Sequence, residues 1–600
     1  MAATSIRIGG ASGFWGDSSV GAPQLVREGR IDFLVFDYLA ELTMSLLAGA
    51  RRRNPALGYA TDFVDVAMRS VLSEVAAQGI RVISNAGGVN PQACAQALRA
   101  LADEAGISLR IAVVEGDDVL AALPALRDEG VRNVQTGGDL PADVLTANAY
   151  LGALPIRAAL DAGAQVVITG RCVDSAVTLG ALMHAFDWTA TDYDRLAQGS
   201  LAGHILECGC QATGGLFTDW RSVPGWDNIG YPIVECTADG SFVVTKPEGT
   251  GGLVSPATVG EQILYEIGDP ARYLLPDVIC DFTDVTLTQA GQDQVRVSGA
   301  RGLAPTASYK VSATYLDGFR ANARLSIVGM EAADKARRTA DAILARVRRL
   351  FAEQGFEDFT DTHVEILGTE AAYGPHATPC ALRDATLHLA VTHPQKAALA
   401  CFSREIAPAG TSWAPGTTGV GGRPQVSPSI RQAAFLIDKA RVHPHVHLDG
   451  VAVPMPAEAM HTPASAQVTG PSGADTPAAD IAARLDDAAG LVEVPLIRIA
   501  HGRSGDKGDI SNVGLIARTP ALLPWLRAQA TPPAVGEWLA HLVQGPITRY
   551  DLPGLHAINL VCERALGGGG MASLRNDPLG KGMAQVVLAM PVRVPAALLP

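Results

Sequence analysis

The stretch Ile6-Arg-Ile-Gly-Gly-Ala-Ser-Gly-Phe-Trp-Gly-Asp-Ser18 joins a short apolar run to a glycine-rich polar turn, and this arrangement recurs along the amino-terminal part of the chain. Further apolar runs, typical of buried strands, lie at residues 33–36, 81–84, 109–114, 131–135 and 165–168. Amphipathic helical stretches separate them at 63–78, 91–104 and 119–129. This alternation predicts a parallel sheet covered by helices. We therefore expect residues 1–244 to form an α/β domain, doubly wound, with a barrel as the alternative.

Almost every predicted strand ends in a polar or glycine-rich turn. These turns are Asp37-Tyr-Leu-Ala-Glu41, Asn85-Ala-Gly-Gly88, Glu115-Gly-Asp-Asp118, Thr136-Gly-Gly-Asp139 and Thr169-Gly-Arg-Cys-Val-Asp174. Open α/β sheets and barrels both place their binding sites at the carboxyl ends of parallel strands. We expect these turns to line the active cleft.

The remainder of the chain has a different pattern. Residues 245–451 combine strands near 285–297, 309–316 and 385–391 with a long helix at 332–355, which predicts an α+β region packed on the first domain. Residues 452–490 are rich in Ala, Pro, Ser, Thr and Asp and are interpreted as a linker. Residues 491–600 are expected to form a small α+β domain, with strands near 494–501, 510–517, 556–563 and 583–594 and a helix near 533–544.

Length and composition exclude several classes of protein. The 600 residues are too many for one hydrophobic core. The net charge of −14 opposes binding to nucleic acid and to anionic membranes. No apolar run reaches the roughly 18 residues that cross a bilayer, and no signal segment is recognised at the start. An odd number of cysteines without framework spacing fits a reducing compartment. We expect a cytoplasmic protein without a membrane span, and a homo-oligomer.

The stretch Arg503-Ser-Gly-Asp-Lys-Gly-Asp509 lies between two apolar runs and is expected to form a loop. Gly505 and Gly508 permit turns that point backbone N–H groups inward, and Arg503 and Lys507 add positive charge suited to phosphate. The alternative is a tight turn whose charges pair with each other in water.

Several motifs occur together and in a fixed order. They are Gly13-Phe-Trp-Gly-Asp17, Asp37-Tyr-Leu-Ala-Glu41, Asn85-Ala-Gly-Gly-Val-Asn-Pro91, Thr169-Gly-Arg-Cys-Val-Asp-Ser175, Gly249-Thr-Gly-Gly-Leu-Val254, Gly299-Ala-Arg-Gly302, Tyr309-Lys-Val311 and Arg503-Ser-Gly-Asp-Lys-Gly508. With them the chain resembles the acyclic terpene utilisation AtuA family over nearly its whole length. The resemblance implies a carboxy-terminal ferredoxin-like domain and acyl-CoA chemistry on branched or terpenoid acids. One member of the family is named as a lyase for a 3-hydroxy-3-isohexenylglutaryl thioester.

The strand-end acids are the candidate catalytic groups. Asp37 and Glu41 lie four residues apart, so a helix beginning there would place them on one face and favour their charged forms. Arg171 and Asp174 follow another strand, where the guanidinium can orient the carboxylate. Glu248, beside the 249–252 glycine cluster, is a third acid candidate. For each pair the alternative is a capping or packing role.

The residues expected to bind the substrate or its coenzyme A part are mostly glycines and polar groups in the same motifs. They are Gly10, Ser12, Gly13, Asn85, Gly87, Gly251, Lys310, Arg503, Ser504, Gly505, Asp506 and Lys507.

Other chemistries find less support in the sequence. The glycines between Gly10 and Gly16 lack dinucleotide-binding spacing, and no Gly-Lys-Ser/Thr follows the 249–252 cluster. No Gly-x-Ser-x-Gly elbow occurs. His443-Pro-His-Val-His447 is the stretch with metal-like spacing, although its proline and the exposure typical of edge histidines favour an ordinary strand. A metal would be better held by strand-end carboxylates, such as those of Asp17, Glu115 and Asp174.

Cys208 and Cys210 are interpreted as ordinary buried thiols, because no second cysteine pair lies near them. We assign no metal ligands and expect no tightly bound cofactor, with a divalent ion as the alternative and coenzyme A present as part of the substrate. The predicted function is a cytoplasmic lyase, of hydratase or retro-Claisen type, acting on a branched 3-hydroxyacyl-CoA or enoyl-CoA thioester. The alternative is a non-catalytic acyl-CoA-binding or regulatory subunit.

Overall fold

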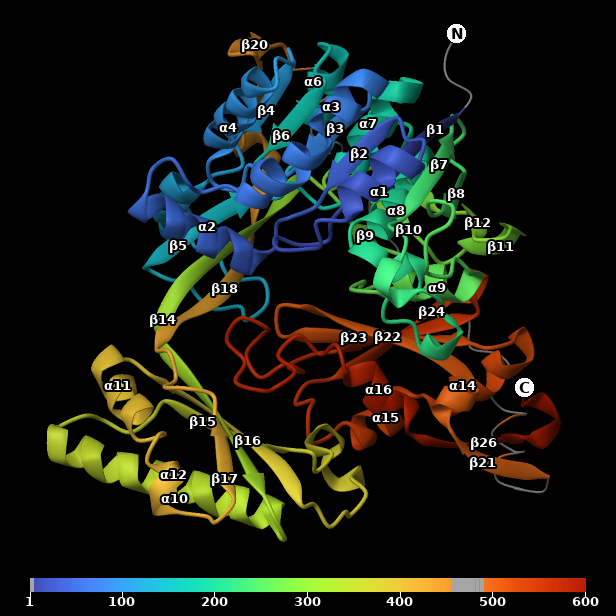
Figure 1. Cartoon of the computed structure of the whole chain (residues 1–600). Coiled ribbons are helices and arrows are strands. Elements are labelled where there is room, and N and C mark those ends of the chain that lie inside the picture. Colours follow the sequence, from blue (N-terminus) through green and yellow to red (C-terminus); the bar gives the residue numbers. More distant parts are fainter. Residues whose placement is uncertain (1–4, 456–480, 482–484, 486–489, 600) are drawn as a thin grey trace.

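The computed structural model describes residues 5–455, 481, 485 and 490–599. Most of the predicted linker lies outside these residues. The chain forms an amino-terminal α/β body, a middle lobe and a carboxy-terminal domain (Figure 1). No described helix has both the length and the apolar character needed to cross a membrane.

An 11-stranded sheet organises the amino-terminal body, in the order β11-β12-β8-β7-β1-β2-β3-β6-β4-β19-β20. Its parallel centre consists of β1 (Ser5–Gly10), β2 (Phe33–Phe36), β3 (Arg81–Ser84), β6 (Val166–Thr169) and β4 (Ile111–Glu115). Antiparallel strands extend both edges: β7 (Ile233–Thr237), β8 (Phe242–Thr245), β12 (Gln294–Ser298) and β11 (Thr286–Gly291) on one side, and β19 (His445–Leu448) and β20 (Val451–Val453) on the other. The sheet is open, which excludes the barrel alternative.

Both faces of this sheet are buried under helices. In β2, Phe33 and Val35 point into one core, and Leu34 and Phe36 into the other. Helices α1 (Gly21–Glu28), α2 (Glu41–Arg53), α3 (Arg69–Gln78) and α4 (Pro91–Glu104) share the core of Leu34. Helices α6 (Leu154–Asp161), α7 (Ala176–Phe186) and α8 (Tyr193–Leu206) share the core of Phe33. This arrangement confirms the predicted doubly wound fold.

The helices that follow the adjacent strands β3 and β6 lie on opposite faces of the sheet. Helix α4 follows β3 on one face, and α7 follows β6 on the other. Such a reversal is a topological switch point, where open α/β sheets bind their ligands. The carboxyl ends of β3 and β6 are therefore the expected centre of a site.

One predicted strand is wrong. Residues 131–135 form a turn, in which Val134 N–H donates to the Ala434 carbonyl at 2.8 Å. The strand of this region is instead β5 (Val144–Ala149), which pairs with β14 outside the main sheet. Its sequence, Val-Leu-Thr-Ala-Asn-Ala, has small and polar residues that carry little strand signal.

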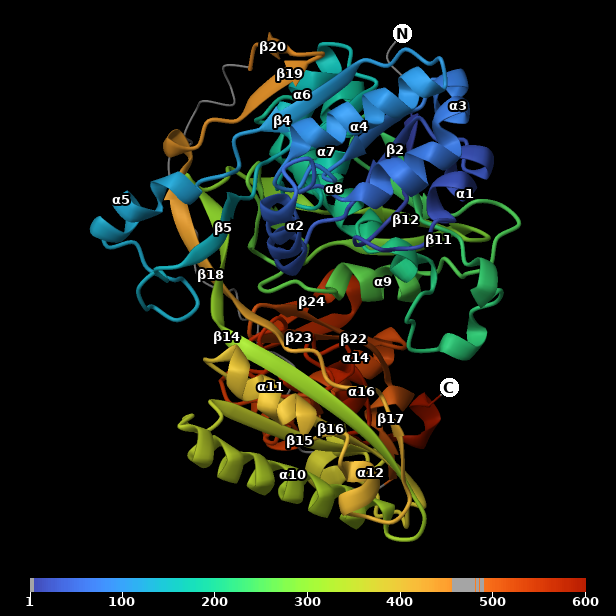
Figure 2. The same cartoon turned by 60° about the vertical axis from the view of Figure 1, so that its left-hand side comes forward.

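A long strand, β14 (Ser308–Val328), runs from the amino-terminal body into the middle lobe. It begins beside β5 and β18 (Ser427–Asp438) and ends between β16 (Asp384–His393) and β17 (Thr417–Val420). The lobe is completed by α10 (Ala332–Gln354), β15 (Asp361–Leu367), α11 (Lys396–Arg404) and α12 (Ala409–Ser412). Residues 245–451 thus contribute both to the amino-terminal body and to the middle lobe (Figure 2). The elements of this range that belong to the amino-terminal body are α9 (Pro256–Leu264), β9 (Tyr273–Leu274), β10 (Ile279–Asp281) and β13 (Arg301–Leu303).

The carboxy-terminal domain has a four-stranded antiparallel sheet, β22-β23-β25-β24, and a separate β21-β26 pair. Its elements are β21 (Leu491–Pro495), β22 (Ala500–Lys507), β23 (Ile510–Ala517), α14 (Leu523–Gln529), α15 (Pro532–Trp538), β24 (Ile547–Leu552), β25 (Ala557–Cys562), α16 (Met583–Leu588) and β26 (Pro591–Pro595). The expected strand at 583–594 is corrected to a helix followed by β26. The expected loop at 503–509 is corrected too: residues 503–507 continue β22, and only Gly508 and Asp509 turn.

The first body and the carboxy-terminal domain meet through α9. Figures 1 and 2 show this helix lying against β22 and β23. Gly514 of β23 allows the close contact, because a Cβ atom there would lie 2.5 Å from the Leu264 Cβ. Asn512 Nδ2 also donates to the Leu264 carbonyl at 2.7 Å. The docking brings the tip of the β22–β23 hairpin to the carboxyl edge of the parallel sheet.

Candidate active site at the carboxyl edge of the parallel sheet

Asp37 follows β2 directly and is held by the turn after β3. Asn85 Nδ2 donates to Asp37 Oδ1 at 2.5 Å, and Asn85 Oδ1 accepts from the Tyr38 backbone N–H at 2.8 Å. Ser12 Oγ donates to the Asp37 carbonyl at 3.0 Å. A buried asparagine that both donates and accepts in this way fixes the orientation of the carboxyl group. The structure thus brings together three of the residues predicted for the site.

The Asp37 carboxyl group has a pKa well above its usual value. Burial is the main cause, and the nearby Asp174 carboxylate adds to it, while the Arg171 guanidinium acts in the opposite direction. A carboxyl group in such surroundings keeps its proton at pH values where an exposed aspartate has lost it. Asp37 is therefore suited to donate a proton.

The pKa of Glu41, the first residue of α2, is shifted in the opposite direction. Burial would raise its pKa, but Lys310, Arg171 and a hydrogen bond from Tyr150 outweigh burial and lower the pKa to about 2. The Tyr150 hydroxyl donates to Glu41 Oε1 at 2.5 Å. Glu41 is therefore a permanent carboxylate.

The expectation that Asp37 and Glu41 share a helix face, with both charged forms favoured, is corrected. Ala40 is extended (φ −123°, ψ 173°), so α2 begins only at Glu41, and Asp37 lies in the strand-to-helix connection. The separation of the two carboxyl groups into different surroundings explains why their pKa values move in opposite directions.

Arg171 is a buried cation at the end of β6. Its NH1 atom lies 2.8 Å from Asp174 Oδ1, and its guanidinium carbon lies 4.2 Å from the centre of the Tyr150 ring. Its backbone N–H donates to Asp117 Oδ2 at 2.9 Å, which fixes the turn. Burial opposes its charge, but Tyr150 and Asp174 raise its pKa well above the usual value. The guanidinium remains positive, as predicted for an orienting partner of Asp174.

Within the described residues, Arg171 Nε is buried and has no hydrogen-bond partner. An unpaired buried donor on a cation is costly unless a ligand accepts from it. Lys310 of β14 also lies near Tyr150, with Nζ 5.1 Å from the ring centre. Burial lowers the Lys310 pKa, and Glu41 acts against this. Two cations therefore border the same aromatic ring.

The hairpin tip of the carboxy-terminal domain completes the site. Partial desolvation of the Lys507 ammonium acts against its charge, but Tyr273 and the carboxylates of Glu266 and Asp174 raise its pKa well above the usual value. Its Nζ lies 3.9 Å from Glu266 Oε2, and Asp174 of the first body acts on its charge. Its side chain is 46% exposed, which leaves it accessible to a ligand.

Asp506 and Lys581 flank Lys507. Burial, with the repulsion of Glu266, raises the Asp506 pKa to about 7. Lys581 Nζ lies 3.1 Å from Glu266 Oε1 and 3.7 Å from Asp506 Oδ1, and it also contacts the Tyr265 hydroxyl. Asp506 and Lys507 of the hairpin, Lys581, and Glu266 of the first body therefore form a cluster of two lysines and two acids at the boundary of the domains.

Arg503 occupies the docking contact instead, and Ser504 is bound within the carboxy-terminal domain. Arg503 is buried, its Nε lies 3.5 Å from Glu261 Oε2 and its NH2 donates to the Gly215 carbonyl at 3.0 Å. Ser504 Oγ donates to the Gly580 carbonyl at 2.7 Å and accepts from Ala584 N–H at 2.9 Å. Gly505 packs against Tyr265. These contacts leave the accessible positive charge to Lys507.

The remaining predicted residues differ in their positions. A Cβ atom on Gly87 would lie 2.4 Å from the Thr169 carbonyl, so this glycine lets the turns after β3 and β6 meet. Gly10 faces Leu206 and Gly13 faces Gly209 at the end of α8. Gly251 lies against Gly225, and Glu248 is exposed in the same segment, without a described side-chain contact to the Asp37 cluster.

Some residues of the site were not predicted from the sequence. Tyr150 and Glu266 come from segments with no motif around them. The run Gly567-Gly-Gly-Gly570 is the sequence signal that indicates this part of the site. It lies beside the hairpin, since a Cβ atom on Gly569 would be 3.3 Å from the Gly508 backbone and one on Gly570 would be 3.4 Å from Asp506 Oδ2.

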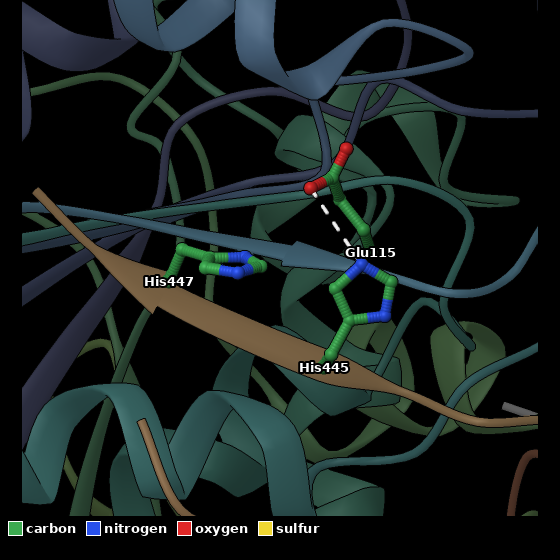
Figure 3. A group of neighbouring side chains, drawn as sticks. All are labelled: Glu115, His445 and His447. Carbon is green, nitrogen blue, oxygen red and sulfur yellow. Dashed lines mark ion pairs between the residues drawn. The ribbon is translucent and has the colours of Figure 1, made fainter. Parts of the chain in front are cut away.

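The structure does not gather Asp17, Glu115 and Asp174 as a common metal site. Asp17 accepts from Gly13 N–H and from the Tyr231 hydroxyl, while Asp174 pairs with Arg171. Glu115 lies instead near His445 and His447 (Figure 3).

Comparison with known proteins identifies the family. The chain matches the acyclic terpene utilisation family protein AtuA over residues 6–448 and the AtuA ferredoxin-like domain over residues 494–593. No curated protein matches it, and no solved structure does. The order of the motifs, the doubly wound sheet and the carboxy-terminal domain agree with these matches, and the chain belongs to the AtuA family of acyclic terpene utilisation.

Proposed function

We propose that the protein is a lyase acting on a branched 3-hydroxyacyl or enoyl thioester of coenzyme A. The observation that supports this most directly is the pair of opposite pKa directions at Asp37 and Glu41, with Arg171 acting on both carboxyl groups. When two titratable groups in one site have pKa values driven apart, one is available as the proton donor and the other as a fixed charge. A subunit that only binds the thioester needs neither a proton donor nor a fixed charge beside it.

The reaction class follows from what these groups can do. In elimination, the Asp174 carboxylate takes the α-proton and protonated Asp37 gives its proton to the leaving 3-hydroxyl group, which departs as water. In carbon–carbon cleavage, the Asp174 carboxylate accepts the hydroxyl proton as the bond between the α and β carbons breaks, and the enolate that forms takes the proton of Asp37. Both routes place negative charge on the thioester carbonyl oxygen. Arg171 Nε and Lys310 are the donors to stabilise that charge.

The coenzyme A part is assigned to the domain boundary. Lys507 and Lys581 supply accessible positive charge, and residues 567–570 supply backbone without side chains beside them. Successive backbone N–H groups can form a concave anion site, and in this run Gly568 N–H donates to a carboxylate, that of Asp509 Oδ1 at 3.0 Å. Arg503 is omitted from this assignment because Glu261 already neutralises it.

A panel of enoyl-CoA and 3-hydroxyacyl-CoA thioesters tests the proposal. The purified chain is incubated with each thioester, and mass spectrometry follows the gain or loss of water or the release of the carbonyl compound formed by cleavage between the α and β carbons. Turnover of at least one member supports the lyase. Binding of several members without any turnover would favour the non-catalytic acyl-CoA-binding subunit.

Lys507→Ala should weaken binding of the full coenzyme A substrate by about 1.5–3 kcal/mol, the range for a lost charge-assisted contact. The effect should fall on KM, because the phosphates are bound equally in the ground and transition states. Kinetics with a pantetheine thioester, which lacks the nucleotide, should show little change. Lys396→Ala, at the exposed start of α11, is the control. Equal losses on both substrates would place Lys507 at the acyl end.

A further inference from the structure

A second cluster of potential ligands lies on the last parallel strand and its antiparallel neighbour. In the register of β4 and β19, His445 lies opposite Glu115 and His447 lies opposite Val113. Residues alternate between the faces of a sheet, so Glu115, His445 and His447 all point to the face covered by α4. Figure 3 shows both histidine rings on the same side of β19, next to the Glu115 side chain.

The three side chains are close enough to share one ion. Each offers a ligand atom, and these atoms all lie within 4.8 Å of one another. His445 Nε2 lies 3.8 Å from Glu115 Oε2. Two ligands of a tetrahedral zinc ion, each at about 2.0–2.2 Å from it, are about 3.3–3.5 Å apart. The His445–Glu115 pair is therefore within a few tenths of an ångström of the spacing that a tetrahedral ion requires.

The tautomer of His445 is already set for coordination. Its Nδ1 lies 3.2 Å from the His443 carbonyl, which can only accept, so Nδ1 carries the proton. In the neutral ring, Nε2 then presents a lone pair toward Glu115. A backbone carbonyl that holds the other ring nitrogen is the usual outer partner of a histidine ligand.

Two further features distinguish this cluster from a surface ion pair: an unpaired buried nitrogen and an outer hydrogen bond. His447 Nδ1 is buried and has no hydrogen-bond partner among the described residues. Gln92 Nε2, at the start of α4, donates to Glu115 Oε2 at 2.6 Å and orients the carboxylate. The first is a polar atom that lacks a partner, and the second is the kind of outer contact that positions a carboxylate ligand.

We propose that Glu115, His445 and His447 bind a divalent transition ion of the zinc type, with water in the remaining position. Two imidazoles and one carboxylate are a ligand set that zinc accepts, whereas calcium and magnesium prefer oxygen ligands. The ion joins β19 to β4, residues more than 300 positions apart in the chain, and secures the β19–β20 hairpin to the sheet edge. The contacts described for the three ligands, to Gln92 and to the His443 carbonyl, do not involve the Asp37 cluster.

Calorimetry on the full chain, freed of metal by a chelator and titrated with zinc chloride, tests the site. We expect one ion per chain, a higher melting temperature with zinc, and an absorption spectrum of low-symmetry coordination when cobalt(II) replaces zinc. Loss of an outer partner of a metal ligand lowers metal affinity by about 10- to 100-fold. His445→Gln removes a ligand itself, at a side chain that is 53% exposed, and should lower the zinc affinity by more than that. Gln92→Leu should show that smaller loss.

The control is His443→Ala, which removes an exposed histidine side chain but keeps the carbonyl that holds His445. This variant should bind zinc like the native chain. His447→Ala, checked for folding by circular dichroism, should lose the cobalt spectrum. The proposal is overturned if the native chain binds no zinc, or if it binds zinc equally well after the His445 change.

Discussion

Asp37→Asn should lower kcat by about 10²–10⁴-fold, the contribution typical of a general acid, on any thioester that the native protein converts. Asparagine has the size of aspartate and keeps an oxygen to accept from Asn85, but it cannot release a proton. The loss should therefore appear in kcat and not in the fold. Steady-state kinetics of the variant beside Asp65→Asn, an exposed aspartate of the same body, measure it.

The pH dependence provides an independent measurement of the same group. Since the folded protein raises the pKa of Asp37, the protonated, active form is present at low pH and is lost as the pH rises through the raised pKa. The same shift means that Asp37 favours folding below its unfolded pKa of about 3.9, and that this contribution is lost as the pH rises. Asp37→Asn should thus have a higher melting temperature than the native chain at alkaline pH.

An Asp37→Asn variant with the native rate and the native pH profile would exclude Asp37 as the proton donor. The site would then have to work through Asp506, whose pKa of about 7 also permits proton transfer, and Asp506→Asn becomes the deciding variant. A loss in kcat with an unchanged pH profile would instead show that Asp37 positions Asn85.

The part of the site that lies at strand ends could be predicted from the sequence. Asp37, Asn85 and Arg171 each follow a short apolar run, and a parallel sheet brings the carboxyl ends of its strands to one edge. The prediction needed only periodicity and the polar residue after each run. Which strand ends meet depends on the strand order, which the sequence pattern does not give: β2, β3 and β6 are neighbours, whereas Glu115 at the end of β4 lies with His445 and His447.

The part that depends on distant pairing could not be predicted. Tyr150 and Lys310 meet only because β5 pairs with β14, and nothing in either segment indicates that partner. The direction of the Asp37 pKa was unpredictable for the same reason, since it depends on burial and on the position of Asp174. Local helix rules favour the charged form of an acid at a helix start, but α2 begins four residues later.

Arg503 shows how charge in a sequence can mislead. Its glycine-rich neighbourhood predicted a phosphate loop, yet the residues continue β22, and alternate side chains of a strand face opposite ways. Arg503 consequently points toward α9, where Glu261 is fully buried. A sequence shows that a cation is present, but it does not show whether an acid from another domain neutralises it.

The largest effect on stability is expected from Arg503→Met. Loss of one partner of a buried ion pair typically costs about 3–5 kcal/mol, because the other charge stays buried without compensation. The Glu261 side chain has no exposed surface, and burial already raises its pKa to about 7 despite Arg503. Denaturant unfolding at neutral pH measures the cost, with Arg593→Met, an exposed arginine of β26, as the control.

The pH dependence and a double variant identify the cause of that loss. A group whose folded pKa is raised stabilises the fold most below its unfolded pKa, about 4.3 for glutamate, and the stabilisation is lost as the pH rises through the folded value. Without Arg503 the Glu261 pKa rises further, so the destabilisation should increase from pH 5 to pH 8. Arg503→Met combined with Glu261→Gln should recover most of the free energy of unfolding. If the double variant is no more stable than the single one, packing of the Arg503 stem, and not its charge, holds the two domains together.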